Sequence, residues 1–527
     1  MQSWLTRRDF LRASGCVASA TLAPALISCA GQRWEKDPFS LGIASGDPTP
    51  DGFVLWTRLA PEPLSPDPAT PGGMSGAAVP VAYEIATDPS MRGIVRQGTA
   101  LAESDFAWSV HAEVTGLPSG RPYWYRFSAG SAQSPIGRTM TAPAPGAQLS
   151  RFRFGFVSCS NYELGYFSAY RHLAEEEPDI AIFLGDYIYE FVGRRLGVRQ
   201  HSDGVTATDL RTYRNRYAQY RTDPDLQRLH AQVPALMTWD DHEVQNDYAD
   251  HWSETFDDPE KFLARRAAAY RAFYEHMPLR PSLSRINGAD MRVYDRYGFG
   301  DLVEFSVLDG RQYRWREACY RPPNDGGGHQ ETILSCPELL DPRRSFLGMT
   351  QEQWLYDGLA RSKARWNVIA QDQLMAEFRE RDGDGHIAYW TDDWNGYPAA
   401  RARLLTNIRD SKVANPVVIG GDIHSFWAND LKLDNSDSRA PIVASEFVGT
   451  SITSFGPPYE TFMKWVPENP HIHFFESRRR GYVLVEVAPE RMDVAMRVVS
   501  DVTDPKATLS TLKRFVVENG RAGPQEA

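Results

Sequence analysis

The chain of 527 residues predicts an α/β protein that begins with an all-β region. Two observations carry this prediction. Short strands separated by turn residues follow one another from Phe39 to about Thr141, and apolar strands alternate with helical segments from Arg151 onward. The length suits two or three domains. We expect a β-sandwich over 38–143, a larger α/β domain over 150–510, and a C-terminal helix or tail over 508–527.

The all-β region contains short segments rich in β-branched and aromatic residues. They are 53–58, 81–86, 108–114 and 123–127. Turn signals such as Asp51-Gly52 and Pro118-Ser119-Gly120 separate them, and a Pro/Ala/Gly linker follows at 141–146. Short strands at this spacing predict a sandwich of the immunoglobulin or fibronectin type.

The second region alternates between the two kinds of element. The expected strands are 151–157, 178–184, 233–238, 292–297, 302–308, 366–370, 416–419, 482–487 and 493–499. The expected helices are 168–176, 208–217, 223–229, 259–275, 350–361 and 398–409. Strands that alternate with helices indicate a layered α/β fold, in which 292–297 and 302–308 belong to a second sheet.

Composition narrows the class of protein. The hydrophobic fraction is 42% and the aromatic fraction 12%, enough for a packed globular core. The net charge is −11, which argues against a specific nucleic-acid reader, although a locally positive pocket could still draw in an anionic substrate.

The first 30 residues predict an export signal rather than folded structure. Residues 6–12 form a twin-arginine motif, and a moderately apolar stretch follows from Ala13 to Ile27. An N-terminal anchor helix is the alternative, but the stretch is short and contains Ser, Gly, Thr and Pro. Leu26-Ile27-Ser28-Cys29 resembles a lipobox, whose cysteine would carry a lipid anchor, and cleavage near Ala23 or Ala25 is the competing interpretation. We expect passage through the Tat translocase to the periplasm, the cell surface or the medium.

Cysteine usage fits an exported protein. Cys16 and Cys29 belong to the processed segment, and Cys319 and Cys336 bracket a loop rich in Pro, Asn and Gly, so a disulfide between them is plausible. Cys159 is then left unpaired. A lone thiol in an oxidising compartment needs burial, catalysis or a metal to explain it.

Metal-competent side chains follow the apolar strands. Asp186 could be a helix cap, Cys159 a core thiol and His242 a surface histidine, so each has a structural explanation alone. Together they are harder to explain by packing, because buried carboxylates without a partner are costly. Strand ends converge on one edge of an α/β fold. The residues are Cys159, Asp186 with Tyr189, Asp240-Asp241-His242, and Asp422 with His424.

The donor types restrict the metal. A thiolate, a phenolate, an imidazole and a carboxylate suit trivalent iron or zinc, and tyrosine is known on ferric iron. The remaining oxygen donors suit calcium, magnesium or manganese. Two cations that share one carboxylate form the arrangement used for phosphoryl chemistry.

These motifs resemble a known family. Gly185-Asp186-x-x-Tyr189, Asp241-His242-Glu243 and Gly421-Asp422-x-His424 are similar to the calcineurin-like metallophosphoesterase pattern, and more narrowly to the alkaline phosphatase D family. The supporting stretches are 158–163, 217–226, 238–248, 394–401 and 420–427. The resemblance runs from Phe39 to near Gly523 and implies a four-layer αββα catalytic domain behind the sandwich.

The resemblance also implies roles for single residues. Fe³⁺ would be held by Cys159, Asp186, Tyr189 and His424, and Asp186 would bridge to Ca²⁺ held by Asp241 and Asp422. His242 would face the phosphate. The usual Asp-x-His motif of the superfamily is replaced by the Cys159 segment, which favours iron. Asp309-Gly310-Arg311 matches a family Asp-Thr-Arg segment, and Arg311 is either a phosphate clamp or part of a structural salt bridge.

The expected function is therefore a secreted alkaline phosphatase and phosphodiesterase that uses iron and calcium to activate hydroxide. A phospholipase D-like or teichoic-acid-type phosphodiesterase is the alternative among enzymes. A lipid-anchored surface binding protein is the alternative outside them. The run Arg478-Arg479-Arg480 is interpreted as a solvated group of charges.

Overall fold

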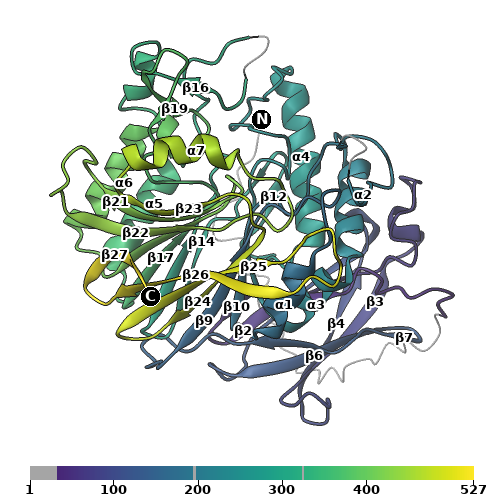
Figure 1. Cartoon of the computed structure of the whole chain (residues 1–527). Coiled ribbons are helices and arrows are strands. Elements are labelled where there is room, and N and C mark those ends of the chain that lie inside the picture. Colours follow the sequence, from purple (N-terminus) through teal and green to yellow (C-terminus); the bar gives the residue numbers. More distant parts are fainter. Residues whose placement is uncertain (1–32, 194–196, 323–325) are drawn as a thin grey trace, which may run out of the picture.

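A computed structural model describes residues 33–193, 197–322 and 326–527. The expected signal peptide and lipobox, with Cys16 and Cys29, lie outside these residues. Two large sheets face each other at the centre of the molecule (Figure 1). The first is ten-stranded, in the order β27 (Arg521–Glu526), β26 (Leu509–Glu518), β25 (Arg491–Val499), β24 (Gly481–Val487), β9 (Phe152–Val157), β10 (Ile180–Leu184), β11 (Ala235–Thr238), β1 (Ile43–Thr49), β2 (Gly52–Arg58) and β5 (Ser109–Val114).

The second sheet is seven-stranded. Its order is β14 (Asp295–Phe299), β15 (Val303–Val307), β17 (Trp366–Ala370), β20 (Pro416–Gly420), β22 (Ile442–Val448), β21 (Phe426–Lys432) and β23 (Ile472–Glu476). The space between the sheets is filled by aromatic and β-branched side chains, among them Phe154 and Phe305, whose ring centroids are 5.0 Å apart. These side chains form the core between the two sheets.

Helices cover the outer face of each sheet. On the first sheet lie α1 (Ser168–Glu175), α2 (Leu210–Arg221), α3 (Pro224–Gln232) and α4 (Pro259–His276). On the second lie α5 (Gly348–Arg361) and α6 (Pro398–Asp410), and α7 (Tyr459–Trp465) packs at the edge of the same layer. The layers are therefore helix, sheet, sheet and helix, which confirms the expected four-layer α/β fold. No helix among the described residues is long and apolar enough to cross a membrane.

The N-terminal region is all-β, as predicted, but it is not a separate body. Its own sheet consists of β4 (Ile94–Ala102), β3 (Val79–Ala86), β6 (Pro122–Ala129), β7 (Ala132–Gln133) and β8 (Gly137–Met140). This sheet packs on β1, β2 and β5, which belong to the ten-stranded sheet. Gly46 of β1 pairs in parallel with Ala235 of β11, so one sheet runs through both regions.

The expected C-terminal helix is wrong. Residues 509–518 and 521–526 form the strands β26 and β27, and β26 pairs with β25 in antiparallel fashion. Phe515 and Val517 alternate with more exposed residues and are buried in the core between the sheets. Apolar residues two positions apart fit a strand with one buried face.

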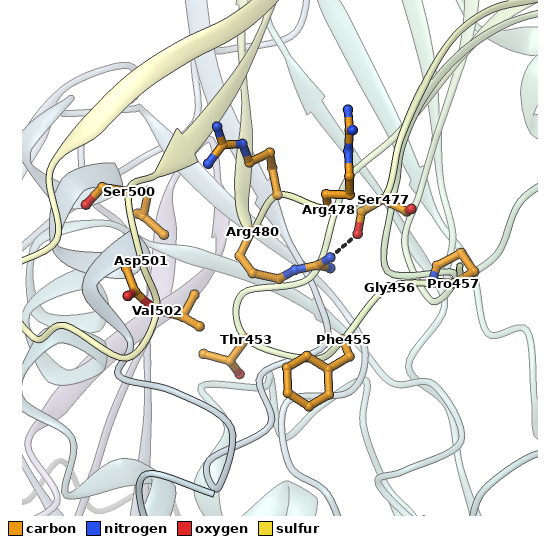
Figure 2. A pocket seen from close by; sticks show the side chains of 12 residues that line it. Thr453, Phe455, Gly456, Pro457, Ser477, Arg478, Arg480, Ser500, Asp501 and Val502 are labelled. Atoms are coloured by element: carbon orange, nitrogen blue, oxygen red, sulfur yellow. Dashed lines mark hydrogen bonds between the residues drawn. The ribbon is translucent and has the colours of Figure 1, made fainter. Parts of the chain in front are cut away.

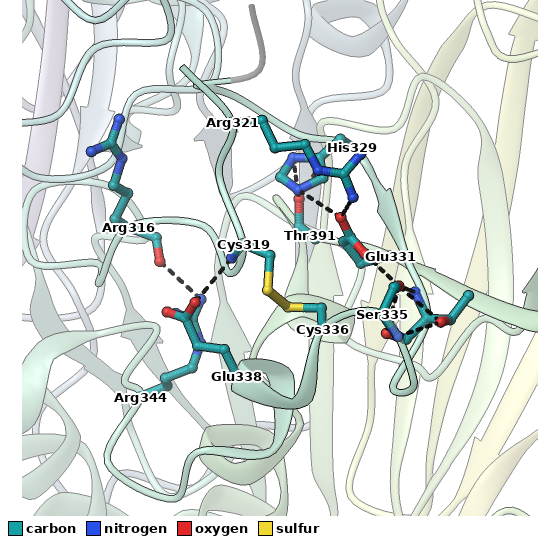
Figure 3. Close-up of a disulfide and its surroundings, with 11 residues drawn as sticks. Arg316, Cys319, Arg321, His329, Glu331, Ser335, Cys336, Glu338, Arg344 and Thr391 are labelled. Atoms are coloured by element: carbon teal, nitrogen blue, oxygen red, sulfur yellow. Dashed lines mark hydrogen bonds and ion pairs between the residues drawn. A yellow bond between two sulfur atoms is a disulfide. The ribbon is translucent and has the colours of Figure 1, made fainter. Parts of the chain in front are cut away.

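Two short sheets lie outside the main layers. One is β12 (Ile286–Asn287) with β13 (Asp290–Met291), and the other is β16 (Gln330–Glu331), β19 (Ile387–Trp390) and β18 (Glu380–Arg381). Near the second, Cys319 and Cys336 form the disulfide that the sequence suggested (Figure 3). The Glu338 carboxylate supports this loop, because it accepts from Cys319 N at 3.1 Å and pairs with Arg344.

Candidate metal centre

The strand ends meet where the sequence predicted. β9, β10 and β11 are parallel neighbours, so the segments that carry Cys159, Asp186 and Asp241 leave the same edge of the sheet. β20 of the facing sheet brings Asp422 close to Asp240 and Asp241, and it brings His424 close to Cys159 and Asp186. The two sheets thus each contribute part of one buried group of donors.

Glu243 helps to hold these strand ends together. Its carboxylate accepts from the backbone N–H groups of Asp186 at 3.1 Å, Tyr187 at 2.6 Å and Asp240 at 2.8 Å. These N–H groups belong to the ends of two neighbouring strands, and they would otherwise be buried without an acceptor. Glu243 is therefore a structural brace under the site.

The backbone is strained at four of the candidate ligands. Cys159, Asp186, Asp422 and His424 have φ values of 61°, 51°, 58° and 54°. Left-handed backbone is uncommon for residues other than glycine and concentrates at functional sites. The strain aims successive side chains into one small volume and fits a site that is selected for chemistry rather than for stability.

The first group of donors, here called the mixed-donor cluster, contains Cys159, Asp186, Tyr189 and His424. Ligand atoms of Cys159, Asp186 and His424 lie within 4.8 Å of one another. The Tyr189 hydroxyl donates to Asp186 Oδ2 at 2.8 Å and lies 3.0 Å from His424 Nε2. Ser454 Oγ donates to the same Tyr189 oxygen at 2.7 Å.

The second group, here called the carboxylate cluster, contains Asp240, Asp241 and Asp422, again with ligand atoms within 4.8 Å of one another. Asp186 links the two clusters, because it also groups with Asp241 and His242 within the same limit. The sequence interpretation did not assign Asp240 as a ligand. Its place in the Asp240-Asp241-His242 run was the available signal.

Carboxylate oxygens without hydrogen-bond partners indicate whether the two clusters are suited to cations. Among the described residues, Asp186 Oδ1, Asp240 Oδ2 and Asp241 Oδ1 are buried without a hydrogen-bond partner. Burial raises the pKa of Asp186 well above its ordinary value, and Asp241 and Asp240 nearby raise it further, although His242 opposes this. Buried carboxylates of this kind need a positive partner. The donor set therefore fits bound cations.

The thiol and the phenol of the mixed-donor cluster show the same pattern. Burial raises the pKa of Cys159 well above its ordinary value, and Asp186 and Asp422 add to the effect. Burial and Asp186 likewise raise the pKa of Tyr189. Both shifts favour the neutral thiol and phenol, whereas a bound metal ion would favour the thiolate and the phenolate.

His242 is held by a residue that the sequence interpretation missed. His242 Nδ1 lies 2.7 Å from Glu190 Oε2, and the other oxygen of Glu190 accepts from Asn246 N at 3.0 Å. The rings of Tyr189 and Phe191 pack on the imidazole, with centroids 4.1 Å and 5.3 Å away. The position of Glu190, directly after the Asp186-x-x-Tyr189 motif, was the only local signal.

The charge on His242 follows from its neighbours. Burial by itself would lower the pKa of His242. Asp241, Asp186 and Glu190 outweigh the burial and raise the pKa well above the ordinary value. These carboxylates favour the protonated imidazole, and Nδ1 is the ring nitrogen that contacts Glu190.

Arg311 lies under the carboxylate cluster and is fully buried. Its Nε donates to Asp240 Oδ1 at 2.6 Å and its Nη1 to Asp392 Oδ1 at 2.7 Å. Nη2 lies 3.7 Å from Asp241 and 3.9 Å from Asp422. Of the two interpretations of Arg311, these contacts favour the structural salt bridge, because its donors already face carboxylates.

Comparisons with known proteins agree with this geometry. The family model described as PhoD-like phosphatase matches residues 154–496, and the model described as PhoD-like phosphatase, N-terminal domain, matches residues 23–143. Alkaline phosphatase D of Bacillus subtilis (strain 168) is 43% identical over 535 residues, which cover 98% of this chain and 88% of that protein.

A solved structure described as "Structure of PhoD" is similar with a TM-score of 0.87 and 43% identity, and the match covers 94% of this chain and 93% of that chain. Sequence and structure therefore agree over both regions of the molecule. The chain belongs to the PhoD-like phosphatase family and is a phosphoric ester hydrolase.

Proposed function

We propose that the protein is an exported hydrolase of phosphate monoesters and diesters whose site holds Fe³⁺ and Ca²⁺. One observation carries this proposal: the buried carboxylate of Asp186 belongs both to the group with Cys159 and His424 and to the group with Asp241 and His242. A carboxylate shared between two cations is the arrangement used for in-line displacement at phosphorus.

Each cation has a proposed set of ligands. Cys159, Asp186, Tyr189 and His424 would hold Fe³⁺, because thiolate, phenolate and imidazole donors suit a trivalent iron. Asp186, Asp241 and Asp422 would hold Ca²⁺, which prefers oxygen donors, and Asp240 is a further candidate. When bound, the cations supply Lewis acidity, which lowers the pKa of water and offsets negative charge on phosphoryl oxygens.

The protein's own residues orient the substrate and supply a proton. Glu190 holds His242 through Nδ1, so the imidazole presents Nε2 to the site. From there His242 donates to a phosphoryl oxygen or to the oxygen of the leaving group, which offsets the charge that develops there. Asp186 acts through its place between the two ligand sets, and Arg311 acts through the carboxylates that it holds.

Export is part of the proposal. Arg7 and Arg8 would direct the chain to the Tat translocase, and Cys29 would be lipidated unless cleavage occurs near Ala23 or Ala25. Mass spectrometry of the mature N-terminus distinguishes the two outcomes. An Arg7→Lys, Arg8→Lys double variant should accumulate inside the cell with its N-terminal segment intact, and normal export of this variant would contradict Tat-dependent passage.

The central experiment combines metal analysis with an ester panel. The purified holoenzyme should contain iron and calcium and should hydrolyse both 4-nitrophenyl phosphate and bis(4-nitrophenyl) phosphate. Removal of calcium with a chelator should abolish turnover, and added Ca²⁺ should restore it. A protein that holds both metals and hydrolyses neither ester would sink the proposal.

A further inference from the structure

A cavity of about 380 Å³ lies beside the mixed-donor cluster (Figure 2). Three connecting segments line it: 453–457, 477–480 and 499–502. Figure 2 shows Thr453 and Phe455 on one wall, Ser477 and Arg480 on a second, and Asp501 on the opposite side. The volume is within the range of about 300–1,000 Å³ that is usual for sites of small ligands.

The wall of the cavity and the metal centre share one segment. Ser454 donates through Oγ to the Tyr189 hydroxyl, while its neighbours Thr453 and Phe455 line the cavity. The carbonyl oxygen of Phe455 accepts from His424 Nδ1 at 2.8 Å. A single turn of chain therefore faces the candidate ligands on one side and the cavity on the other.

Solvent reaches the metal centre on the side of this segment. The side chains of Asp422 and His424 are 27% and 25% exposed, whereas that of Asp186 is 1% exposed. Phe455 is 70% exposed and is bonded to His424, so it borders the open edge. The cavity that Phe455 lines therefore adjoins the open side of the metal centre.

One arginine of the cavity has no ionic partner. The sequence suggested that Arg478, Arg479 and Arg480 are all solvated. In the structure, however, Arg478 pairs with Glu476, and Arg480 donates to the backbone oxygen of His424. Arg479 is exposed and has no ion pair among the described residues. Ser477 is buried, and its backbone oxygen accepts from Arg480, so Arg479 is the cation that is left for a ligand.

We infer that this cavity is a subsite for the second ester substituent of a phosphodiester, and that it favours a substituent with an anionic group. The inference rests on the proposed diesterase function. The apolar part of the substituent packs on Phe455, which is the large exposed ring at the rim. Arg479 contacts the anionic end. Asp501, on the opposite side, repels it and confines it to the arginine wall.

The test uses two diesters with the same 4-nitrophenolate leaving group. One carries an ethyl group as its second substituent and the other a 2-phosphonoethyl group. The holoenzyme should show a higher kcat/KM for the anionic ester. Arg479→Ala should reduce this preference about fivefold, chiefly through KM, because an exposed charge pair is worth little more than that. Added salt should weaken the preference through screening.

Matched variants separate the subsite from general effects. Asp501→Asn should increase the preference about twofold, since it removes an opposing charge. Arg479→Lys should retain at least half of it. Arg439→Ala removes an exposed arginine that is outside the cavity and pairs with Asp437, and it should change nothing. Activity of Arg479→Ala on the ethyl ester monitors its folding.

The possible outcomes distinguish a failure of the subsite from a failure of the diesterase function. If the holoenzyme hydrolyses both esters without a preference, or if Arg479→Ala and Arg479→Lys keep the full preference, the subsite is overturned while the diesterase function stands. If it cleaves monoesters but neither diester, the diesterase function fails and the subsite fails with it.

Discussion

The mixed-donor cluster and the carboxylate cluster share Asp186, yet they bury negative charge in different ways. In the carboxylate cluster, the guanidinium of Arg311 lies against Asp240 and within 4 Å of Asp241 and Asp422. In the mixed-donor cluster, Tyr189 bonds to Asp186, His424 and Ser454, which are not cations in this surrounding, since burial lowers the pKa of His424 to about 3.

The difference indicates how much each cluster depends on a metal. Arg311 is a permanent cation that offsets part of the charge of the carboxylate cluster. Burial raises the pKa of Cys159, Tyr189 and Asp186, and among the described residues no guanidinium pairs with their side chains, so ionisation of these groups depends more on a bound cation. We therefore expect the mixed-donor cluster to hold its metal tightly and the carboxylate cluster to exchange its metal more readily.

The largest effect should come from the residue that joins the clusters. Asp186→Asn removes the shared charge, so both cations should be held less well, and kcat/KM should fall ~10³-fold, the upper end of the loss when one electrostatic stabiliser of a transition state is removed. Metal content and kcat/KM on bis(4-nitrophenyl) phosphate measure this. Asp384→Asn, at an exposed turn, is the control. Loss of only one metal would contradict a shared ligand.

A pair of variants should separate the two clusters. Cys159→Ser should lose iron and visible absorption but retain calcium, because the thiolate belongs only to the mixed-donor cluster. Asp241→Asn should show the opposite. Each should reduce kcat/KM by at least about 10²-fold, because loss of a ligand should cost more than the 10- to 100-fold loss typical of residues that only support ligands. Metal analysis and absorption spectra are the readouts, and identical metal losses in both variants would mean that the clusters are not distinct.

Loss of Glu190, which holds His242, should reduce activity less than loss of a metal ligand. Glu190→Gln should lower kcat about 10- to 100-fold with little change in KM, the usual range for supporting residues. The limb of the pH–rate profile that reports His242 should move to lower pH, because Glu190 is one of the groups that raise the pKa of His242. Glu254→Gln is the control, since Glu254 bonds to the Asn246 side chain. An unmoved profile would exclude Glu190 from positioning His242.

Arg311→Met decides between the two interpretations of Arg311. Because it leaves Asp240 and Asp392 buried without their cation, the free energy of unfolding should fall by about 3–5 kcal/mol. Arg343→Met, which breaks an exposed pair with Asp341, should leave the free energy of unfolding nearly unchanged. Denaturant titration measures both. Unchanged stability with a raised KM would instead favour the phosphate clamp.

The smallest expected effect concerns Asp47, a buried carboxylate outside both clusters. Asp47 accepts from Tyr297 OH and Arg280 N, each at 2.8 Å, so its oxygens are satisfied by the protein itself. Burial raises the pKa of Asp47 to about 6. The folded state therefore holds this proton more tightly than the unfolded state, and the resulting stability is present below pH ~4 and is lost as pH rises through about 6.

Asp47→Asn should accordingly gain about 2 kcal/mol relative to the wild type at pH 8 and less at pH 5. Asparagine tolerates the left-handed backbone at this position, where φ is 46°. Unfolding free energies at the two pH values are the measurement. A difference between variant and wild type that does not change with pH would show that burial of Asp47 carries no such cost, and would weaken the same argument for Asp186.

Much of the molecule could be predicted from local pattern. Apolar runs marked the strands that end at Cys159, Asp186, Asp241 and Asp422, because a buried strand has few other signatures. The prediction of a C-terminal helix was wrong for a related reason. The alternation at Phe515 and Val517 gains its meaning only from the adjacent strand β25, with which β26 pairs.

The sequence alone determined which donors are available and that they follow buried strands, since both depend on a few neighbouring residues. Only the tertiary structure decided which donors share a cation and which are supported by the protein. Glu190 contacts His242 across 52 positions, and Arg311 contacts Asp392 across 81. Such contacts depend on how two sheets pack and on the cost of burying charge, and no local pattern records either.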